Sequence, residues 1–416
     1  LLLYSLLLIQ KDDKLIIKDD FVDQRHLKTY IIDVKEAKEA DDAISIEQRS
    51  NKESIIWIHI SSPSLFLETN SDIDNQAKER GSSLYLIDQY IPMLNLELIN
   101  RCGFKSHKES KSLSIGVILT NEGHIKSYNL IQSIIQPNLE INYEEADELI
   151  QLRYKEEQEI CELYQILKNR SSLRKLNGAL LIDQTYGKLN YKDSTVQIEI
   201  IEPSNSRLMI SEAMILMGEC ISQYMKENSI PTIYRCHKYK CDINQLLKTY
   251  HYYESKYTII KQFIGKSYLS TKVNEHNSMG LESYLQVTSP LRRYTDLLIH
   301  RQIISFLVGK PLISEDEITN YIDRYNKIIR SNNLYIRQNQ NKYLNLFFMK
   351  SDNKYWKVFF IRWINNKRSI ALVKFADIYY EALITLYINT EMSIGKLIFI
   401  KYNSYNKDNN NLTFVE

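Results

Sequence analysis

Residues 29–44, TYIIDVKEAKEADDAI, place a cluster of acidic side chains between two short apolar runs. Apolar residues at positions 30 to 32, and again at 43, 44 and 46, predict two strands, so the acids are expected on the connection between them. Carboxylates gathered on one short connection raise one another's pKa unless a cation neutralises them. Mg²⁺ is the natural candidate because it takes hard oxygen ligands. Four of these acids are the candidate ligands and catalytic groups: Asp33, Glu39, Asp41 and Asp42.

The same charges also fit a solvated helical turn. In KEAKEADDA, residues 35–43, Lys35 and Glu39, or Lys38 and Asp42, have the i,i+4 spacing of ion pairs on a helix surface. Runs of charge are usually solvated faces. The motif alone therefore leaves both interpretations open.

A second segment, GLESYLQVTSPLRRYTDLLIHR at residues 280–301, favours the first interpretation. Thr288 or Ser289 is a good N-cap and Pro290 a good first residue, so a helix is predicted to begin there. The buried side of that helix would carry Leu291, Tyr294, Leu297 and Leu298.

Arg292 and Arg293 would fall in the first turn of this predicted helix. A helix N-terminus favours anions over cations, so two arginines there indicate a bound anion, and phosphate is the usual one. The alternative is that Arg293 only pairs with a nearby acid such as Asp296. One or two carboxylates plus a substrate phosphate are also the usual way in which Mg²⁺ is held.

The order of these motifs resembles the ribonuclease II and ribonuclease R family, which shares the RNB domain. An aspartate, five residues, an acid, one residue and two aspartates before an Ala-Ile strand resemble its catalytic signature, and TSPLRRYTDLLIHR (288–301) resembles its second signature. The resemblance covers residues 21–350 and is closest in form to the cyanobacterial and plastid branch. Between the two signatures lie, in the family's order, IIWIHISSPS (55–64), RGSSLYLIDQYIPML (80–94), INYEEADELI (141–150), ISEAMILMGE (210–219) and IPTIYRCH (230–237).

The resemblance implies an α+β fold. An RNB catalytic domain of mixed strands and helices around an RNA channel is expected at 21–350, and a short leader without the family's cold-shock-type OB domains at 1–20. Five short β-rich runs at 354–416 independently predict a small OB-type barrel, the position of the family's C-terminal RNA-binding domain. Aromatic residues in that stretch are interleaved with the basic residues Lys357, Arg362, Lys374, Lys396 and Lys401, a pattern compatible with single-stranded RNA.

Spacing also predicts three further helices. They are expected over residues 143–175, from about Ser211 to Glu227, and from near Ser314 onward. The second carries a methionine stripe at helical spacing, which predicts a face that packs in the core.

The resemblance also implies an activity: 3′-to-5′ hydrolysis of single-stranded RNA to nucleoside 5′-monophosphates by metal-assisted in-line displacement. Tyr85 matches the tyrosine that stacks on the 3′-terminal nucleotide. The residues implied are Asp33, Glu39, Asp41, Asp42 and Arg292 for catalysis, Asp33, Glu39 and Asp42 for Mg²⁺, and Tyr85, Arg80, Arg292 and Arg293 for substrate.

Three positions depart from the family pattern. Glu39 stands where the family has aspartate, Ser62 where it commonly has one, and IRQNQNKY (336–343) lacks a glutamate found late in the corresponding helix. The extra methylene of Glu39 moves a carboxylate by about 1.5 Å, whereas catalytic geometry tolerates about 0.5 Å. The alternative is therefore an RNB-family protein that binds RNA with little or no hydrolysis. A metal-dependent phosphatase would explain neither Tyr85 nor the barrel.

Composition limits the partners. With 416 residues, 44% of them hydrophobic, the chain can bury a large core and a small second one. Its 53 basic and 51 acidic residues leave a net charge of +2, so RNA must bind in a local groove. Five cysteines without a CxxC pair favour a reducing compartment, and the apolar start is too short to span a membrane. We expect a monomer without membrane contact, in a bacterial cytoplasm or a plastid stroma.

Overall fold

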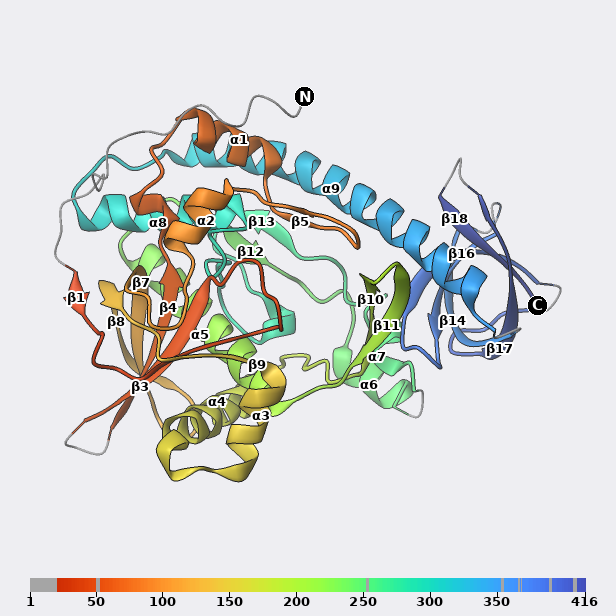
Figure 1. Ribbon diagram of the computed structural model, residues 1–416, viewed down its shortest axis with the longest axis horizontal. Coiled ribbons are helices and arrows are strands. Elements are labelled where there is room, and N and C mark those ends of the chain that lie inside the picture. The colour runs from red at the N-terminus through yellow and green to blue at the C-terminus, as the bar shows by residue number, and fades with distance from the viewer. Residues whose placement is uncertain are drawn as a thin grey trace.

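The computed structural model describes residues 21–416 except 50–52, 252–253, 353–354, 366, 368, 389–390 and 407–409 (Figure 1). The leader expected at residues 1–20 lies outside the described residues. A mixed sheet covered by helices forms the larger body, and a long helix connects it to a small β-barrel. The α+β class is confirmed.

The larger body is built on a seven-stranded sheet with the order β1-β8-β7-β4-β3-β2-β9. The pairs β1/β8 and β2/β9 are parallel, and the other neighbours are antiparallel. The two strands predicted around the acidic connection are adjacent in the sheet. The strands are β1 (Val22–Asp23), β2 (Thr29–Asp33), β3 (Asp42–Gln48), β4 (Ser54–Ser61), β7 (Ser110–Leu119), β8 (Ile125–Ile135) and β9 (Leu139–Asn142).

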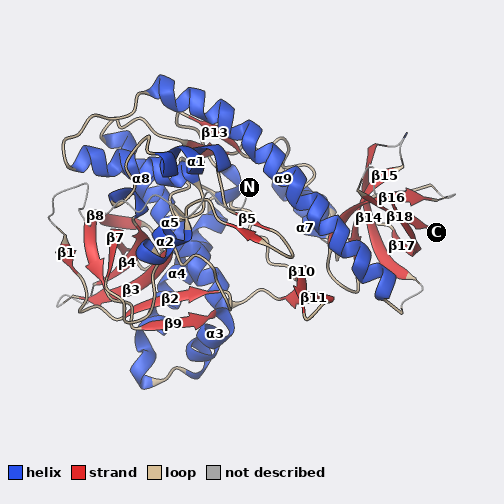
Figure 2. Cartoon of the chain, turned by 45° about the horizontal axis from the view of Figure 1, so that its top comes forward, coloured by secondary structure: helices blue, strands red, loops and turns tan. Residues whose placement is uncertain are grey.

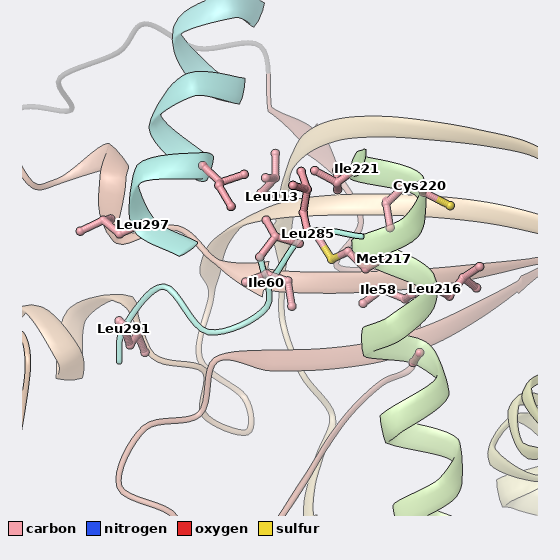
Figure 3. Packing of buried hydrophobic residues seen from close by; sticks show 14 of the residues in the cluster. Ile58, Ile60, Leu113, Leu216, Met217, Cys220, Ile221, Leu285, Leu291 and Leu297 are labelled. Atoms are coloured by element: carbon pink, nitrogen blue, oxygen red, sulfur yellow. The ribbon is translucent and has the colours of Figure 1, made fainter. Parts of the chain in front are cut away.

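Helix α5 (Asn205–Glu227) packs on the sheet and is the centre of the main core. Figure 3 shows Met217 of α5 pointing toward Ile58 and Ile60 of β4, and these three residues are buried. The methionine stripe is therefore core, as its helical spacing predicts. The helix begins at Asn205 and not at 211 as predicted, because the Ser204 side chain caps it by accepting from the amide of Arg207.

The remaining helices surround this core (Figures 1 and 2). The single helix predicted over 143–175 is interrupted, since Arg153 adopts a left-handed conformation (φ 53°) that ends its first part. The elements are α1 (Asp72–Arg80), α2 (Leu96–Cys102), α3 (Tyr143–Leu152), α4 (Gln158–Leu176), α6 (Ile243–Thr249), α7 (Lys256–Ile260), α8 (Tyr294–Leu307), the 3₁₀ turns η1 (Pro63–Leu65), η2 (Lys155–Glu157) and η3 (Asn277–Met279), and the two-stranded ribbons β5 (Leu84–Tyr85) with β6 (Tyr90–Ile91), β10 (Tyr186–Lys192) with β11 (Thr195–Ile201), and β12 (Tyr234–Cys236) with β13 (Tyr268–Ser270).

Helix α9 (Glu315–Lys350) begins at Ser314, as predicted, and runs from the larger body to the barrel (Figure 2). Ser314 and Glu317 form a capping box, in which each side chain accepts from the other residue's amide. At its far end Phe348 packs into the barrel core. Among the residues that the structure describes, α9 included, no helix is both long and apolar enough to cross a lipid bilayer.

The barrel is closed, with the order β14-β15-β16-β18-β17. Only the pair β16/β18 is parallel, which is the arrangement of an OB fold. Of the basic residues proposed for RNA, Lys374 is buried, and burial lowers its pKa. Arg362 donates to Gln262 near α7 at 2.8 Å. The strands are β14 (Trp356–Asn365), β15 (Ile370–Phe375), β16 (Glu381–Tyr387), β17 (Leu397–Asn406) and β18 (Asn411–Val415).

Candidate active site

The acidic connection joins the end of β2 to the start of β3. Asp33 is the last residue of β2 and Asp42 the first of β3. The residues between them, 34–41, are all described and contain no helix, so the alternative of a solvated helical turn is wrong. Glu39 and Asp41 are 5% and 1% exposed. Two of the four acids are therefore held inside the protein.

Asp41 links the acidic connection to the arginine segment. Its Oδ1 accepts from the amide of Leu291 at 2.9 Å and from Ser61 Oγ at 3.1 Å. Its Oδ2 lies 3.5 Å from Arg292 Nε and has no hydrogen-bond partner in the described part of the chain. Burial raises the pKa of Asp41 to about 8, and the charge of Arg292 opposes that rise. An unpartnered buried carboxylate oxygen beside a guanidinium is available to a ligand or a water molecule.

Asp33 and Asp42 act on each other electrostatically. Burial raises the pKa of Asp42 to about 7, and the charge of Asp33 adds to the rise. Burial also raises the pKa of Asp33, partly opposed by the hydrogen bond from the Val34 amide at 2.6 Å. Both carboxylates are therefore costly to ionise unless a cation lies between them.

The oxygen donors of this acidic connection suit Mg²⁺. Nowhere in the described part of the chain do three or more His, Cys, Asp or Glu side chains gather closely enough to hold a metal by themselves. Mg²⁺ does not need such a cage, because it commonly binds one or two carboxylates and completes its octahedron with water and substrate phosphate. Asp33 and Asp42 fit that requirement.

Helix α8 begins later than the sequence predicts. The prediction of a start at 288–290 is wrong, since Arg293 is the N-cap and has extended backbone angles (φ −134°, ψ 120°). The Ser289 amide donates to the side chain of Asp296 at 3.0 Å, which holds this segment outside the helix. The apolar residues predicted on its inner side, Leu291, Tyr294, Leu297 and Leu298, are all buried.

The two neighbouring arginines have different surroundings. Arg293 donates to Asp296 Oδ2 from Nε at 2.9 Å and from Nη2 at 2.6 Å, so its pairing with Asp296, the alternative raised above, is confirmed. The Arg292 side chain is 41% exposed, and its Nε lies 3.5 Å from Asp41 Oδ2. Arg292 is therefore the arginine that can turn toward a substrate.

A third segment, residues 80–93, completes the site. The Ser83 amide donates to the Arg292 carbonyl at 3.0 Å, and the Tyr294 amide donates to the Gly81 carbonyl at 3.0 Å. Arg80 donates from Nη1 to the backbone carbonyls of Pro92 and Met93 at 3.2 and 3.1 Å. Arg80 was expected to bind substrate. Its guanidinium donates instead to the backbone that follows β6, and it thereby holds the end of the β5–β6 ribbon.

Tyr85 lies on this ribbon beside the acids. Tyr85 is 45% exposed, and its ring centroid lies 5.4 Å from that of Tyr90. The Tyr85 hydroxyl donates to Glu39 Oε2, and Ser83 Oγ donates to Glu39 Oε1 at 2.8 Å. Three segments far apart in the sequence therefore bring together Asp33, Glu39, Asp41, Asp42, Tyr85 and Arg292.

Two further residues border the acids and were missed in the sequence. In the parallel pair of β2 and β9, Asp33 lies opposite Asn142, which places Tyr143 next to the site. The pKa of Tyr143 is raised by burial and then by the charges of Asp33 and Asp42. The Arg207 guanidinium lies 4.2 Å from the Tyr143 ring centroid. No spacing rule marks either residue, because strand pairing brings Tyr143 here and Arg207 comes from helix α5.

Comparison with known proteins assigns a family. A family model described as the RNB domain matches residues 21–309. An uncharacterized ribonuclease of Synechocystis is 32% identical over 289 residues, which cover 69% of this chain and 43% of that protein. Ribonuclease II, chloroplastic/mitochondrial, of Arabidopsis thaliana is 30% identical over 296 residues, which cover 69% of this chain and 37% of that protein. This chain thus spans less than half the length of either relative.

Solved structures share the fold at lower identity. RNase R of Mycoplasma genitalium in complex with ribose methylated single-stranded RNA has a TM-score of 0.84 at 18% identity, covering 96% of this chain and 72% of that one. Yeast Ssd1, described as a pseudonuclease, has a TM-score of 0.65 at 13% identity, and the match covers 86% of this chain and 49% of that one. The same fold therefore occurs in proteins described as a nuclease and as a pseudonuclease.

Proposed function

The chain belongs to the RNB domain family, and from that premise we propose that it is a Mg²⁺-dependent exoribonuclease. It shortens single-stranded RNA from the 3′ end and releases nucleoside 5′-monophosphates. One observation carries the proposal: Asp41 contacts both the Leu291 amide and the Arg292 guanidinium across 250 positions of sequence. This contact supports a site in which the Arg292 guanidinium stabilises phosphate charge beside acids that hold Mg²⁺.

Asp33 and Asp42 hold the Mg²⁺. When bound, the ion polarises the scissile phosphate and supplies an activated water molecule. The mutual repulsion of these two carboxylates, whose pKa values are raised by burial, is relieved by a divalent ion. Glu39, also expected as a ligand, directs both carboxylate oxygens to hydroxyls of the ribbon.

The other residues bind and orient the substrate. Arg292 neutralises charge that develops on the scissile phosphate, the role in which preorganised donors contribute most to catalysis. Asp41 Oδ2, which accepts no hydrogen bond among the described residues, orients the attacking water. The exposed ring of Tyr85 stacks on the 3′-terminal base, an interaction worth about 1–3 kcal/mol that tolerates any base. The barrel adds contacts to the single strand upstream.

The relatives' sources guide the expected location. One comes from a cyanobacterium, and another is described as chloroplastic or mitochondrial. We place this protein in a bacterial cytoplasm or a plastid stroma, as a monomer that acts on RNA away from membranes.

A second candidate function is RNA binding with weak or no hydrolysis. One observation favours it: Glu39 replaces the family's aspartate, and its carboxylate contacts Ser83 and Tyr85. If that acid were needed as a metal ligand, the centre would lack one donor. The two functions share the RNA partner and differ only in turnover.

A 5′-labelled oligoribonucleotide incubated with the protein and Mg²⁺ distinguishes them. The exonuclease produces a ladder of 3′-shortened products that EDTA abolishes and Asp41→Asn suppresses. Asp72→Asn, a change in the first turn of α1, is the matched control and leaves the ladder intact. Binding in a gel-shift assay without shortening would establish the second function.

A further inference from the structure

Both carboxylate oxygens of Glu39 accept hydrogen bonds from the segment that forms the β5–β6 ribbon. Its side chain is 5% exposed. Oε1 accepts from Ser83 Oγ at 2.8 Å, and Oε2 accepts from the Tyr85 hydroxyl, 46 positions along the chain. Hydrogen bonds to a charged acceptor in a buried setting are stronger than neutral ones. The carboxylate is therefore held on the side of the site that faces the ribbon.

Ser83 connects this carboxylate to the arginine segment. Its hydroxyl donates to Glu39 and accepts from the Met93 amide at 2.8 Å, while its own amide donates to the Arg292 carbonyl at 3.0 Å. The residue is 7% exposed, so water does not compete for these bonds. A movement of Glu39 would disturb the ribbon and the backbone of Arg292 together.

Tyr85 is fixed at one end and open at the other. Two torsion angles position a tyrosine ring, so a hydrogen bond at the hydroxyl and the contact with Tyr90 at 5.4 Å together restrict its plane. Burial raises the pKa of Tyr85, and the neighbouring Glu39 charge raises it further, so the hydroxyl remains a donor. The residue as a whole is still 45% exposed.

The length of the acid at position 39 matters for this contact. Aspartate would withdraw the carboxylate by about 1.5 Å, which exceeds the tolerance of a hydrogen bond. The extra methylene of Glu39 thus permits the contact with Tyr85. The departure from the family pattern has a structural use in this chain.

We propose that Glu39 is a positioning residue for Tyr85 and not a ligand of the metal. Its carboxylate sets the plane of the tyrosine ring on which the 3′-terminal base stacks. This inference rests on the proposed function, since it assigns the tyrosine to the RNA end. It predicts that changes at 39 alter recognition of the terminal base and leave metal affinity unchanged.

The test uses the full chain and a single-stranded RNA with 2-aminopurine as its 3′-terminal base, in EDTA so that no cleavage occurs. Stacking on Tyr85 quenches the fluorophore in the parent. Glu39→Ala and Tyr85→Phe are each expected to reduce the quenching and to weaken binding about 10-fold. Because both break the same hydrogen bond, the double variant shows no further loss. Additive losses would overturn the proposal, as would an absence of quenching in the parent.

Metal affinity is measured separately by Mn²⁺ titration of the RNA-free protein. Glu39→Gln is expected to bind Mn²⁺ within about 2-fold of the parent, whereas Asp42→Asn weakens binding at least about 10-fold. Glu36→Gln, on the same connection and exposed, is the matched control in both measurements. Equal losses of Mn²⁺ affinity in Glu39→Gln and Asp42→Asn would show that Glu39 is a ligand after all.

These measurements separate the inference from the proposed function. A parent protein that binds and quenches the RNA end but never shortens it would refute the exonuclease proposal alone. The coupling between Glu39 and Tyr85 would still be decided by the fluorescence measurement. Glu39→Asp provides the conservative comparison, and it is expected to behave as Glu39→Ala does, because the shorter acid does not reach the hydroxyl.

Discussion

Replacement of Arg292 and Arg293 by lysine should separate catalysis from stability at two adjacent positions. Arg292 is 41% exposed on its side chain and its Nε lies 3.5 Å from Asp41. Such a partly exposed pair contributes at most about 1 kcal/mol to folding. Loss of a preorganised donor to the transition state costs about 100- to 1000-fold in rate, or about 2.7–4 kcal/mol. Arg292→Lys should therefore lose most activity while Tm changes by about 3 °C or less.

Arg293 should behave in the opposite way. Its guanidinium makes two hydrogen bonds to Asp296, whose side chain is 0% exposed. Lysine keeps the charge but cannot make both bonds, and loss of a hydrogen bond to a charged group costs about 1.5–3 kcal/mol. Arg293→Lys should therefore unfold at lower urea concentration while the folded fraction keeps its rate.

The assay is single-turnover degradation of a 5′-labelled oligoribonucleotide at saturating protein, with thermal unfolding of each variant in the same buffer. Asp72→Asn again serves as the control. A rate for Arg292→Lys within about 3-fold of the parent would refute the role of Arg292 at the phosphate. A rate loss of about 100-fold in Arg293→Lys without destabilisation would show that the two roles are reversed.

Three further predictions follow from other residues. Asp42→Asn should raise the Mg²⁺ concentration for half-maximal activity at least about 10-fold, as measured from initial rates. Excess Mg²⁺ should recover part of the lost activity. An unchanged Mg²⁺ requirement would exclude Asp42 as a ligand. Glu212→Ala leaves Arg174 buried without its ion-pair partner, so the free energy of unfolding in urea should fall by about 3–5 kcal/mol; a loss below about 1 kcal/mol would contradict this. Burial lowers the pKa of His59 from 6.5 to about 3. As the pH falls from 6.5 toward 3, His59 is therefore protonated in the unfolded state but not in the folded state. The free energy of unfolding should decrease over this range, by up to about 4–5 kcal/mol from this residue. In His59→Gln that part of the pH dependence, followed by chemical unfolding, should disappear.

The parts of the fold that could be predicted are those encoded locally. The apolar runs on either side of the acidic connection are short and bounded by charges, and they form β2 and β3. Ser314 with Glu317 is a capping box that marks the start of α9. Five short β-rich runs after residue 354 form the closed barrel. In each case the signal lies within a few residues of the element that it specifies.

The errors arise where distant side chains compete with local propensity. Ser289 and Pro290 predict a helix start, yet the Leu291 amide donates to Asp41 instead, and the helix begins at Tyr294. An acceptor 250 positions away cannot be read from the local sequence. The segment therefore forms a turn that presents Arg292 to the acids.

The candidate site shows the same division. The acids at 33 and 42 are the last residue of β2 and the first of β3, within one residue of the connection on which they were expected. The contact of Glu39 with Tyr85 depends on where the β5–β6 ribbon packs. Tyr143 reaches the site only through the pairing of β9 with β2. Tertiary contacts of this kind leave no mark in the spacing of one sequence.

The central claim is that carboxylates from the acidic connection and the Arg292 guanidinium act on the same phosphodiester. A crystal structure of the Asp41→Asn protein with Mn²⁺ and single-stranded RNA, with the metal located by its anomalous signal, tests it most directly. We predict the metal at about 2.1 Å from carboxylate oxygens of Asp33 and Asp42, with Arg292 within hydrogen-bond distance of the phosphate that the metal contacts. A metal bound elsewhere, or an RNA 3′ end that does not lie between Asp42 and Arg292, would contradict the claim.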